Sequence, residues 1–362
     1  MRKDETTSAS GSRAAQRRIA EGECSSTLTS LIVVTSVLRA CFTELIPIAG
    51  SAAWWMLPVC LLPGLAMYAA LRLLMHSTGT ETISTCVRLL LGRIGACVFS
   101  VFKTLLMLTE GFLSAYTLRR LFTETISTEG TPLTITLLIG LAFFFCENRE
   151  GLPRTVFFLR RLLLIMLASA AVNWLFMVRT DCFYPLAGDG KPALLRAFRQ
   201  CFSIGWPLVL YLDDQPNSSG KAYSLRPLVP CAICCLVAAL VVSNLPHGML
   251  TAMREWSGRL RPITDYQFSA VRMMTYLLFL AAFFLTAVGC IQRSANAFAK
   301  GSFSVRFRVL IVVVCAAQLV VGDELLPIMT KLSAYGLYPS ILLAALCLCM
   351  TLFSQGRKER LQ

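Results

Sequence analysis

The sequence predicts an all-α polytopic membrane protein with about ten transmembrane helices. Of its 362 residues, 56% are hydrophobic and 15% are charged, whereas soluble domains carry about 25% charged residues. The mean hydropathy is +0.65. A helix that spans a bilayer needs about 20 mostly apolar residues, and ten such runs can be placed, at 28–48, 52–74, 94–118, 132–147, 155–178, 200–213, 227–246, 267–290, 308–327 and 335–354.

The charges favour cytoplasmic termini. Ten spans place both ends of the chain on one side, and both ends are basic. With the termini inside, the cytoplasmic loops and tails together carry more Lys and Arg than the outer loops, as the positive-inside rule requires. The net charge of +14 then reflects loop residues that face anionic lipid headgroups. We therefore expect membrane lipids, and no nucleic acid, as partners.

Cysteine and histidine usage gives no sign of a metal site, a cofactor or an enzyme. Most of the 15 cysteines lie inside the apolar runs, where a free thiol behaves as a small hydrophobic side chain. The segment at 231–235, CAICC, has no companion pair that would complete a zinc site. The two histidines, His76 and His247, lie at ends of runs. No catalytic set or nucleotide-binding loop is visible, so we expect a protein that is not an enzyme.

Two of the runs are interrupted. The first contains Arg39, Glu44 and Pro47, and the sixth contains Trp206 between Gly205 and Pro207. A broken helix is tolerated in lipid where it lines a cavity, and paired interruptions in two halves of a chain indicate a transporter's binding site. Spans one and six correspond in a 5+5 inverted repeat with discontinuous helices 1 and 6. The alternative is that Gly and Pro only kink these helices.

The predicted domain organisation follows from these runs. Residues 1–27 are polar and are expected to form a disordered cytoplasmic tail, and residues 355–362 a basic cytoplasmic tail. The transmembrane domain covers 28–354, with repeat one at about 28–178 and repeat two at about 200–354.

The buried charges need partners, because a charge near the bilayer centre costs at least about 2.5–3.5 kcal/mol. Arg39 and Glu44 lie about 140° apart on a regular α-helix, so the sequence favours a helix that unwinds between them. Alternatively, one of the two charges reaches the membrane interface. Lys103 and Glu110 share one face of span three. Either Arg39 pairs with Glu110 in a charge network within the bundle, or Glu110 faces a ligand or a proton path.

An ordered series of loop residues resembles a known family. Thr131-Pro132 opens span four, Arg149-Glu150-Gly151 precedes Arg154, and Asp181 to Pro185 is followed by Gly188, Gly190 and Pro192. The segment LLLGRIGA at 89–96 fits the same pattern. This series resembles the spore germination permeases, the GerAB-type B subunits of endospore germinant receptors. The resemblance covers the whole chain in architecture and mainly residues 85–210 in sequence.

The resemblance implies a fold, a function and partners. The fold is that of the amino acid–polyamine–organocation superfamily, with a cradle between two repeats. The implied function is to bind a small germinant, in the first instance an amino acid, in the spore inner membrane or cell membrane, so that germination begins. The other receptor subunits, of A and C type, would be partners. Two alternatives stay open: an amino acid secondary transporter of the same superfamily, and a degenerate structural subunit of the receptor.

The predicted ligand-binding residues lie at the two interruptions. Half-helix N-termini bind a carboxylate and freed carbonyls bind an ammonium in this fold. The candidates are Cys41, Phe42, Thr43 and Glu44 in span one, Ser203, Ile204, Gly205 and Trp206 in span six, and Glu110 on the opposite wall. Gly205 is the strongest choice, because a glycine lets a ligand approach the backbone.

The topology is testable by cysteine labelling. We expect a single cysteine introduced in loop 212–224 of a cysteine-free variant to react only from the cytoplasmic side. A cysteine in loop 179–199 should react only from outside. Reaction of loop 212–224 with an impermeant reagent from outside would overturn the ten-span arrangement.

Overall fold

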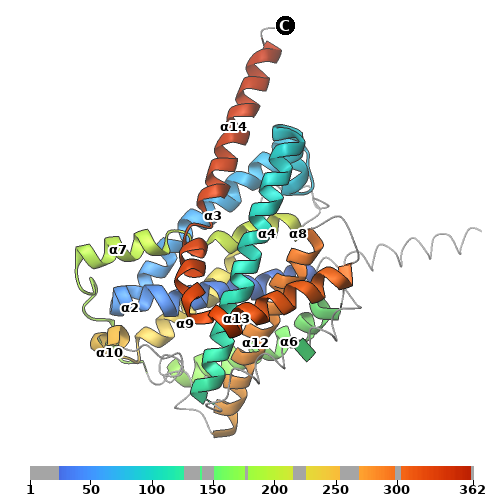
Figure 1. Cartoon of the computed structure of the whole chain (residues 1–362). Helices are drawn as coiled ribbons and strands as arrows, with labels where there is room; N and C mark the ends of the chain where they lie inside the picture. The colour runs from blue at the N-terminus through green and yellow to red at the C-terminus, as the bar shows by residue number, and fades with distance from the viewer. Residues whose placement is uncertain are drawn as a thin grey trace, which may run out of the picture.

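The computed structural model describes residues 24–125, 139–140, 151–175, 178–214, 226–252, 269–297 and 303–359. All regular elements in these ranges are helical (Figure 1). After a helix at 24–40 the order is η1 (Cys41–Leu45), α2 (Ile46–Ala49), η2 (Gly50–Ala52), α3 (Ala53–Thr78), α4 (Ile83–Thr125), α6 (Gly151–Leu175), η3 (Thr180–Phe183), α7 (Lys191–Cys201), η4 (Trp206–Leu210), α8 (Tyr211–Asp214), α9 (Leu228–Val242), α10 (His247–Ala252), α12 (Ser269–Ala297), α13 (Phe303–Ala334) and α14 (Tyr338–Glu359).

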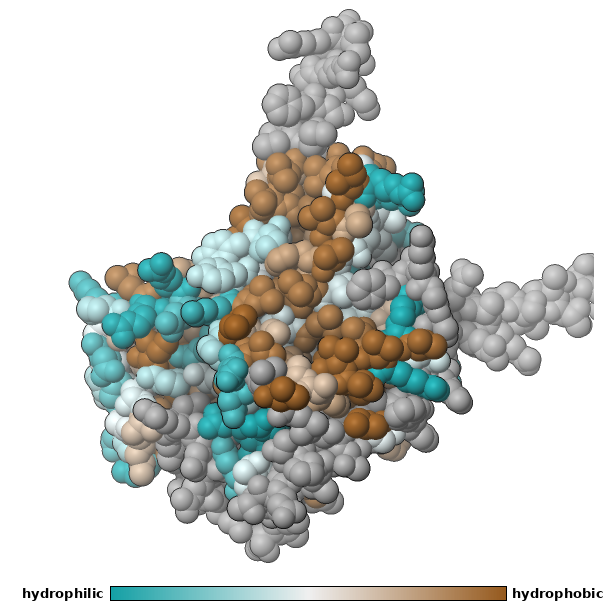
Figure 2. Space-filling model, in the orientation of Figure 1, coloured by the Kyte–Doolittle hydropathy of each residue, from teal (hydrophilic) through white to brown (hydrophobic). Residues whose placement is uncertain are grey.

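The described helices are those of an all-α membrane protein. Four helical stretches among them are long and apolar enough to cross a bilayer: Cys24–Thr78, Ile83–Glu124, Tyr276–Asn296 and Asp323–Leu348. A shorter apolar helix covers Leu228–Val242. Hydrophobic side chains cover much of the face where α4, α13 and α14 lie (Figure 2). The count of ten spans and the 5+5 repeat stay predictions, and most of the run at 132–147 lies outside the described residues.

Both ends of the helical region extend beyond the predicted boundaries. Residues 24–27, expected in the N-terminal tail, already belong to the first helix. Residues 355–359, expected in the basic C-terminal tail, belong to α14. The rest of each tail lies outside the described residues.

The first interruption is a π-helix rather than an unwound segment, which corrects the prediction. In η1 the N–H of Ile46 donates to the carbonyl of Cys41, five residues earlier, the hydrogen bond that defines a π-helix. The helix then turns sharply at Gly50, where φ is 54°. A side chain at Gly50 would also lie 2.4 Å from the His247 ring. The backbone groups near Arg39 therefore stay hydrogen-bonded within the helix.

The sixth run has little α-helix. After α7 ends at Cys201, residues 202–205 form turns, and the 3₁₀-helix η4 continues to Leu210. Pro207 lies in the first turn of η4, where its missing N–H costs no intrahelical hydrogen bond. The backbone of span six is therefore irregular from Phe202 to Leu210.

Helix packing sets the position of these two segments. α4 packs along α12 and α13, and α3 packs against α9 and η4. The hydroxyls of Thr35 and Thr286 lie 2.8 Å apart and join the first helix to α12. At the contact between α3 and the irregular segment, a Cβ on Gly64 would lie 2.4 Å from the carbonyl oxygen of Gly205. So close an approach of the two backbones requires glycine at position 64.

The contact between Gly64 and Gly205 gives a stability prediction. Gly64→Ala should lower the free energy of unfolding by about 1–3 kcal/mol, because overpacking a tight contact forces the backbones apart. Thermal unfolding of the purified protein measures this change.

Gly248→Ala is the matched control, since a Cβ there meets no atom within 4 Å. It should change the free energy of unfolding by no more than about 0.5 kcal/mol. Equal stability of the Gly64 and Gly248 variants would contradict the close packing of α3 on span six.

Candidate functional site

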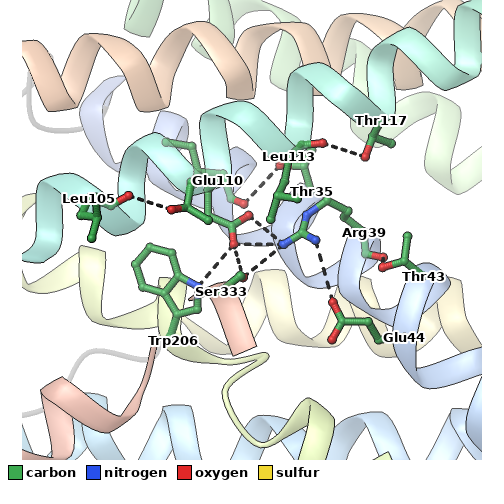
Figure 3. A network of polar contacts seen from close by, with 12 residues as sticks. Thr35, Arg39, Thr43, Glu44, Leu105, Glu110, Leu113, Thr117, Trp206 and Ser333 are labelled. Atoms are coloured by element: carbon green, nitrogen blue, oxygen red, sulfur yellow. Dashed lines mark hydrogen bonds and ion pairs between the residues drawn. The ribbon is translucent and has the colours of Figure 1, made fainter. Parts of the chain in front are cut away.

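A buried ion pair joins the first helix to α4. Nη2 of Arg39 lies 3.0 Å from both carboxylate oxygens of Glu110 (Figure 3). The two side chains are 3% and 1% exposed. A carboxylate and a guanidinium removed from water to this degree compensate mainly each other's charge. The pairing across helices is the one that the sequence proposes for these residues.

Two further elements bind the same carboxylate. The Ser333 hydroxyl, at the end of α13, donates to Oε1 of Glu110 over 2.5 Å and accepts from Arg39 over 3.3 Å. The indole N–H of Trp206, from η4, donates to Oε1 over 3.4 Å. Glu110 therefore holds together the first helix, α4, α13 and span six at one point.

The π-helix brings a second carboxylate to Arg39. Oε1 of Glu44 lies 4.0 Å from Nη1 of Arg39, and the Glu44 side chain is 15% exposed. On a regular α-helix, residues five apart do not face each other, whereas hydrogen bonds between residues five apart place them on one side. The π-helix is thus the local reason that Arg39 meets both carboxylates.

The charges in this cluster do not cancel. One guanidinium faces two carboxylates, so the formal charge is −1 when both acids are ionised. The Nε of Arg39 and the hydroxyl of Ser36 are buried without a hydrogen-bond partner among the described residues. Such groups usually have a partner in native proteins. The cluster can therefore accept a cation and further hydrogen bonds.

A small cavity adjoins the cluster. Its volume is about 10 Å³, which is room for about one water molecule. It is lined by Ser36, Arg39, Ala40, Glu44, Glu110, Gln200, Cys201, Ser203, Ile204, Trp206, Pro207, Ser333 and Ala334. An amino acid would enter only after the walls move apart.

The structure places five of the nine predicted ligand residues on this cavity: Glu44, Glu110, Ser203, Ile204 and Trp206. The side chains of Cys41 and Phe42 are fully buried in the core. Thr43 is exposed, and its hydroxyl donates to the carbonyl of Arg39 over 2.9 Å. None of these three residues lines the cavity.

Gly205, predicted to bind the ligand, and Lys103, predicted in the charge network, make other contacts. Gly205 faces Gly64 of α3 and does not line the cavity, so its small size is explained by packing rather than by ligand approach. Lys103 forms an ion pair with Asp213 of α8 and is not a contact of the Arg39 cluster. Arg39 and Lys103, predicted to share one charge network, therefore belong to two separate groups of ion pairs.

Three polar residues of the site carry no sequence signal that identifies them: Ser36, Gln200 and Ser333. Ser333 lies 223 positions from its partner Glu110, between two apolar runs, where a serine is unremarkable. Only the packing of α13 against α4 brings the two side chains together.

A separate Ser–His–Asp arrangement lies where the chain turns after α2. Nδ1 of His247 lies 3.1 Å from the Ser51 hydroxyl, and Nε2 lies 2.9 Å from Oδ1 of Asp189. The Ser51 side chain is fully buried, and its hydroxyl donates to the carbonyl of Pro185 over 2.6 Å. The single hydroxyl proton of Ser51 therefore points to a backbone carbonyl rather than to the imidazole. These hydrogen bonds therefore hold loop 179–190 against the turn that follows α2.

Metal ligands do not cluster in the part of the chain that the structure describes, where no three His, Cys, Asp or Glu side chains are placed to hold an ion. Comparison with known proteins adds no relative: no protein-family model matches the chain, and no curated protein matches it. The function must therefore be inferred from the residues of the site and from the sequence resemblance.

The Arg39–Glu110 pair should be strongly coupled. We expect Glu110→Gln to cost about 3–5 kcal/mol of unfolding free energy, because it leaves a buried guanidinium without its main partner. In a double-mutant cycle with Arg39→Met, the coupling energy should be about 1–3 kcal/mol.

The control cycle uses Arg119→Met and Asp323→Asn. Arg119 and Asp323 lie 3.2 Å apart, and Asp323 is 74% exposed. Solvent screening should keep their coupling below about 1 kcal/mol. Equal coupling energies in the two cycles would refute the role assigned to Glu110.

Proposed function

We propose that the chain is a germinant receptor B subunit with a transporter fold, which binds a small germinant, an amino acid in the first instance, within the membrane. The proposal includes ten spans in a 5+5 repeat and partner subunits of A and C type. One observation carries it: the interruptions of spans one and six meet at a buried cluster of one arginine and two carboxylates. The resemblance to the spore germination permeases supports it independently.

The chemistry of the cluster fits a zwitterion. When Glu44 is ionised, the second carboxylate leaves the cluster one cation short, and an ammonium group would supply it. The unpaired Nε of Arg39 and the Ser36 hydroxyl can donate to a ligand carboxylate. Charged residues inside a membrane mark ligand or ion pathways by default. This arrangement therefore suits an amino acid better than a neutral solute.

Binding requires the cavity to enlarge, and Trp206 is the side chain best placed to move. Its bond to Glu110 is long, at 3.4 Å, and therefore weak. Glu110 keeps Arg39 and Ser333 when that bond is lost. On this proposal, displacement of the indole makes room for the ligand. It also moves the turn at 335–337, because the indole packs closely against Gly336, where a Cβ would lie 2.9 Å from the ring.

The size of the cavity favours a second candidate, a structural subunit whose cradle binds nothing. A space for about one water molecule suits a site that is permanently closed. The two candidates differ in a measurable way, because only a binding subunit discriminates among amino acids.

Binding of radiolabelled amino acids to the purified full chain tests the proposal. Glu44→Gln should weaken binding at least about tenfold, because losing a charge-assisted hydrogen bond costs about 1.5–3 kcal/mol. Glu324→Gln, an exposed acid on α13, is the control and should bind as the unmodified protein does. Spores that carry the Glu44 variant should need correspondingly more germinant.

Two results would count against the proposal. If no amino acid binds at millimolar concentration and the Glu44 spores respond normally, the structural subunit is the better description. If vesicles that contain the chain accumulate labelled amino acids, the chain is a secondary transporter.

A further inference from the structure

A second, larger cavity lies between the first helix, α6, α9 and α12. Its volume is about 390 Å³, within the usual range for small-molecule sites. Apolar side chains form most of its wall, among them Leu31, Val34, Ile233, Leu278 and Phe283. Leu164 and Val229 on its wall are 45% and 61% exposed, so the cavity opens to the surface of the helices.

Two adjacent arginines lie at the edge of this cavity. Arg160 and Arg161 of α6 both line it, and both side chains are exposed. The guanidinium of Arg160 lies over the Phe157 ring, 4.8 Å from its centroid. Among the residues that the structure describes, neither guanidinium has an acidic partner. The edge thus carries two positive charges beside an apolar interior.

The cavity extends to the starts of the first helix and α9, beside the first half of α6. Thr27 lies in the first turn of the helix at 24–40, Val229 is the second residue of α9, and Arg160 is the tenth of α6. On the topology predicted from the charges, all three starts face the cytoplasm. Arg160 and Arg161 are the sixth and seventh residues of the predicted span 155–178. Their long side chains can therefore extend to the headgroups of the inner leaflet, where anionic lipids attract Lys and Arg.

We propose that this cavity binds an anionic phospholipid from the surrounding bilayer. Its acyl chain lies among the apolar residues of the first helix, α9 and α12, and its phosphate lies between Arg160 and Arg161. A dry apolar cavity excludes water but accepts hydrocarbon, and in a membrane the adjacent hydrocarbon is an acyl chain. The two guanidinium groups bind the phosphate and thereby favour a headgroup with net negative charge over one whose phosphate is neutralised by its own cation.

The position of the site links lipid to the first helix. Leu31, Val34, Thr35 and Leu38 line the lipid cavity, and Arg39 follows them on the same helix. An acyl chain between this helix and α6 supports the helix that carries Arg39 and the π-helix. The inference rests on the membrane setting and on the predicted topology, and it holds whether or not the cradle binds an amino acid.

Native mass spectrometry of the purified, delipidated full chain tests the site. The protein is titrated in detergent with phosphatidylglycerol and, separately, with phosphatidylcholine. We expect phosphatidylglycerol to bind at least about tenfold more tightly. The double variant Arg160→Gln/Arg161→Gln should bind phosphatidylglycerol about 10–30-fold more weakly, given the usual contribution of each basic residue.

The control double variant is Arg88→Gln/Arg93→Gln, which removes two exposed arginines of α4 that do not line the cavity. It should bind phosphatidylglycerol within about twofold of the unmodified chain. If both double variants lose affinity equally, the lipid responds to net charge alone and the site is refuted.

A second pair of variants tests the acyl chain. Ile233→Trp places a large side chain in the cavity, whereas Leu236→Trp lies on α9 outside the lining residues and is 43% exposed. Only Ile233→Trp should reduce phosphatidylglycerol binding, by at least about fivefold. Glycerol phosphate, which has no acyl chain, should not displace the lipid. Equal binding by both tryptophan variants, or displacement by glycerol phosphate, would overturn the proposal.

Discussion

The ion pair between Arg39 and Glu110 is the constraint on which the centre of the molecule depends. Both side chains are almost completely buried, and a buried charge that loses its partner costs several kcal/mol. Satisfying Glu110 requires the first helix, the end of α13 and η4 to lie at fixed positions around the middle of α4. The same groups then form the walls of the small cavity.

Two local features make this arrangement possible. The π-helix turns Glu44 to the side of Arg39, and the contact between Gly64 and Gly205 lets the irregular segment of span six approach α3 closely. Both features shape the backbone around the site. Each allows a segment without regular α-helix to remain inside the protein, where its backbone groups can be satisfied.

The functional proposals rest on different evidence. The germinant receptor proposal combines a resemblance in the loops with a charged cluster at the meeting point of two interrupted helices. The lipid proposal uses neither the resemblance nor the cluster; it rests on an apolar cavity with two arginines at its edge. The two sites share the first helix, so a lipid and a ligand would act on the same element from opposite ends.

The sequence by itself determined that the chain is helical, apolar and membrane-embedded, because those properties depend on composition and on the length of the apolar runs. It also pointed to Arg39, Glu44, Glu110 and Trp206, since charges and helix-breaking residues are conspicuous in an apolar run.

Tertiary structure alone decided which of these residues meet. It paired Lys103 with Asp213, placed Gly205 against Gly64, and brought Ser333 to Glu110 across 223 positions of the chain. It also decided that the first helix widens into a π-helix instead of unwinding. The physical reason is that contacts between distant helices depend on their packing and rotation, which the periodicity of one apolar run does not specify.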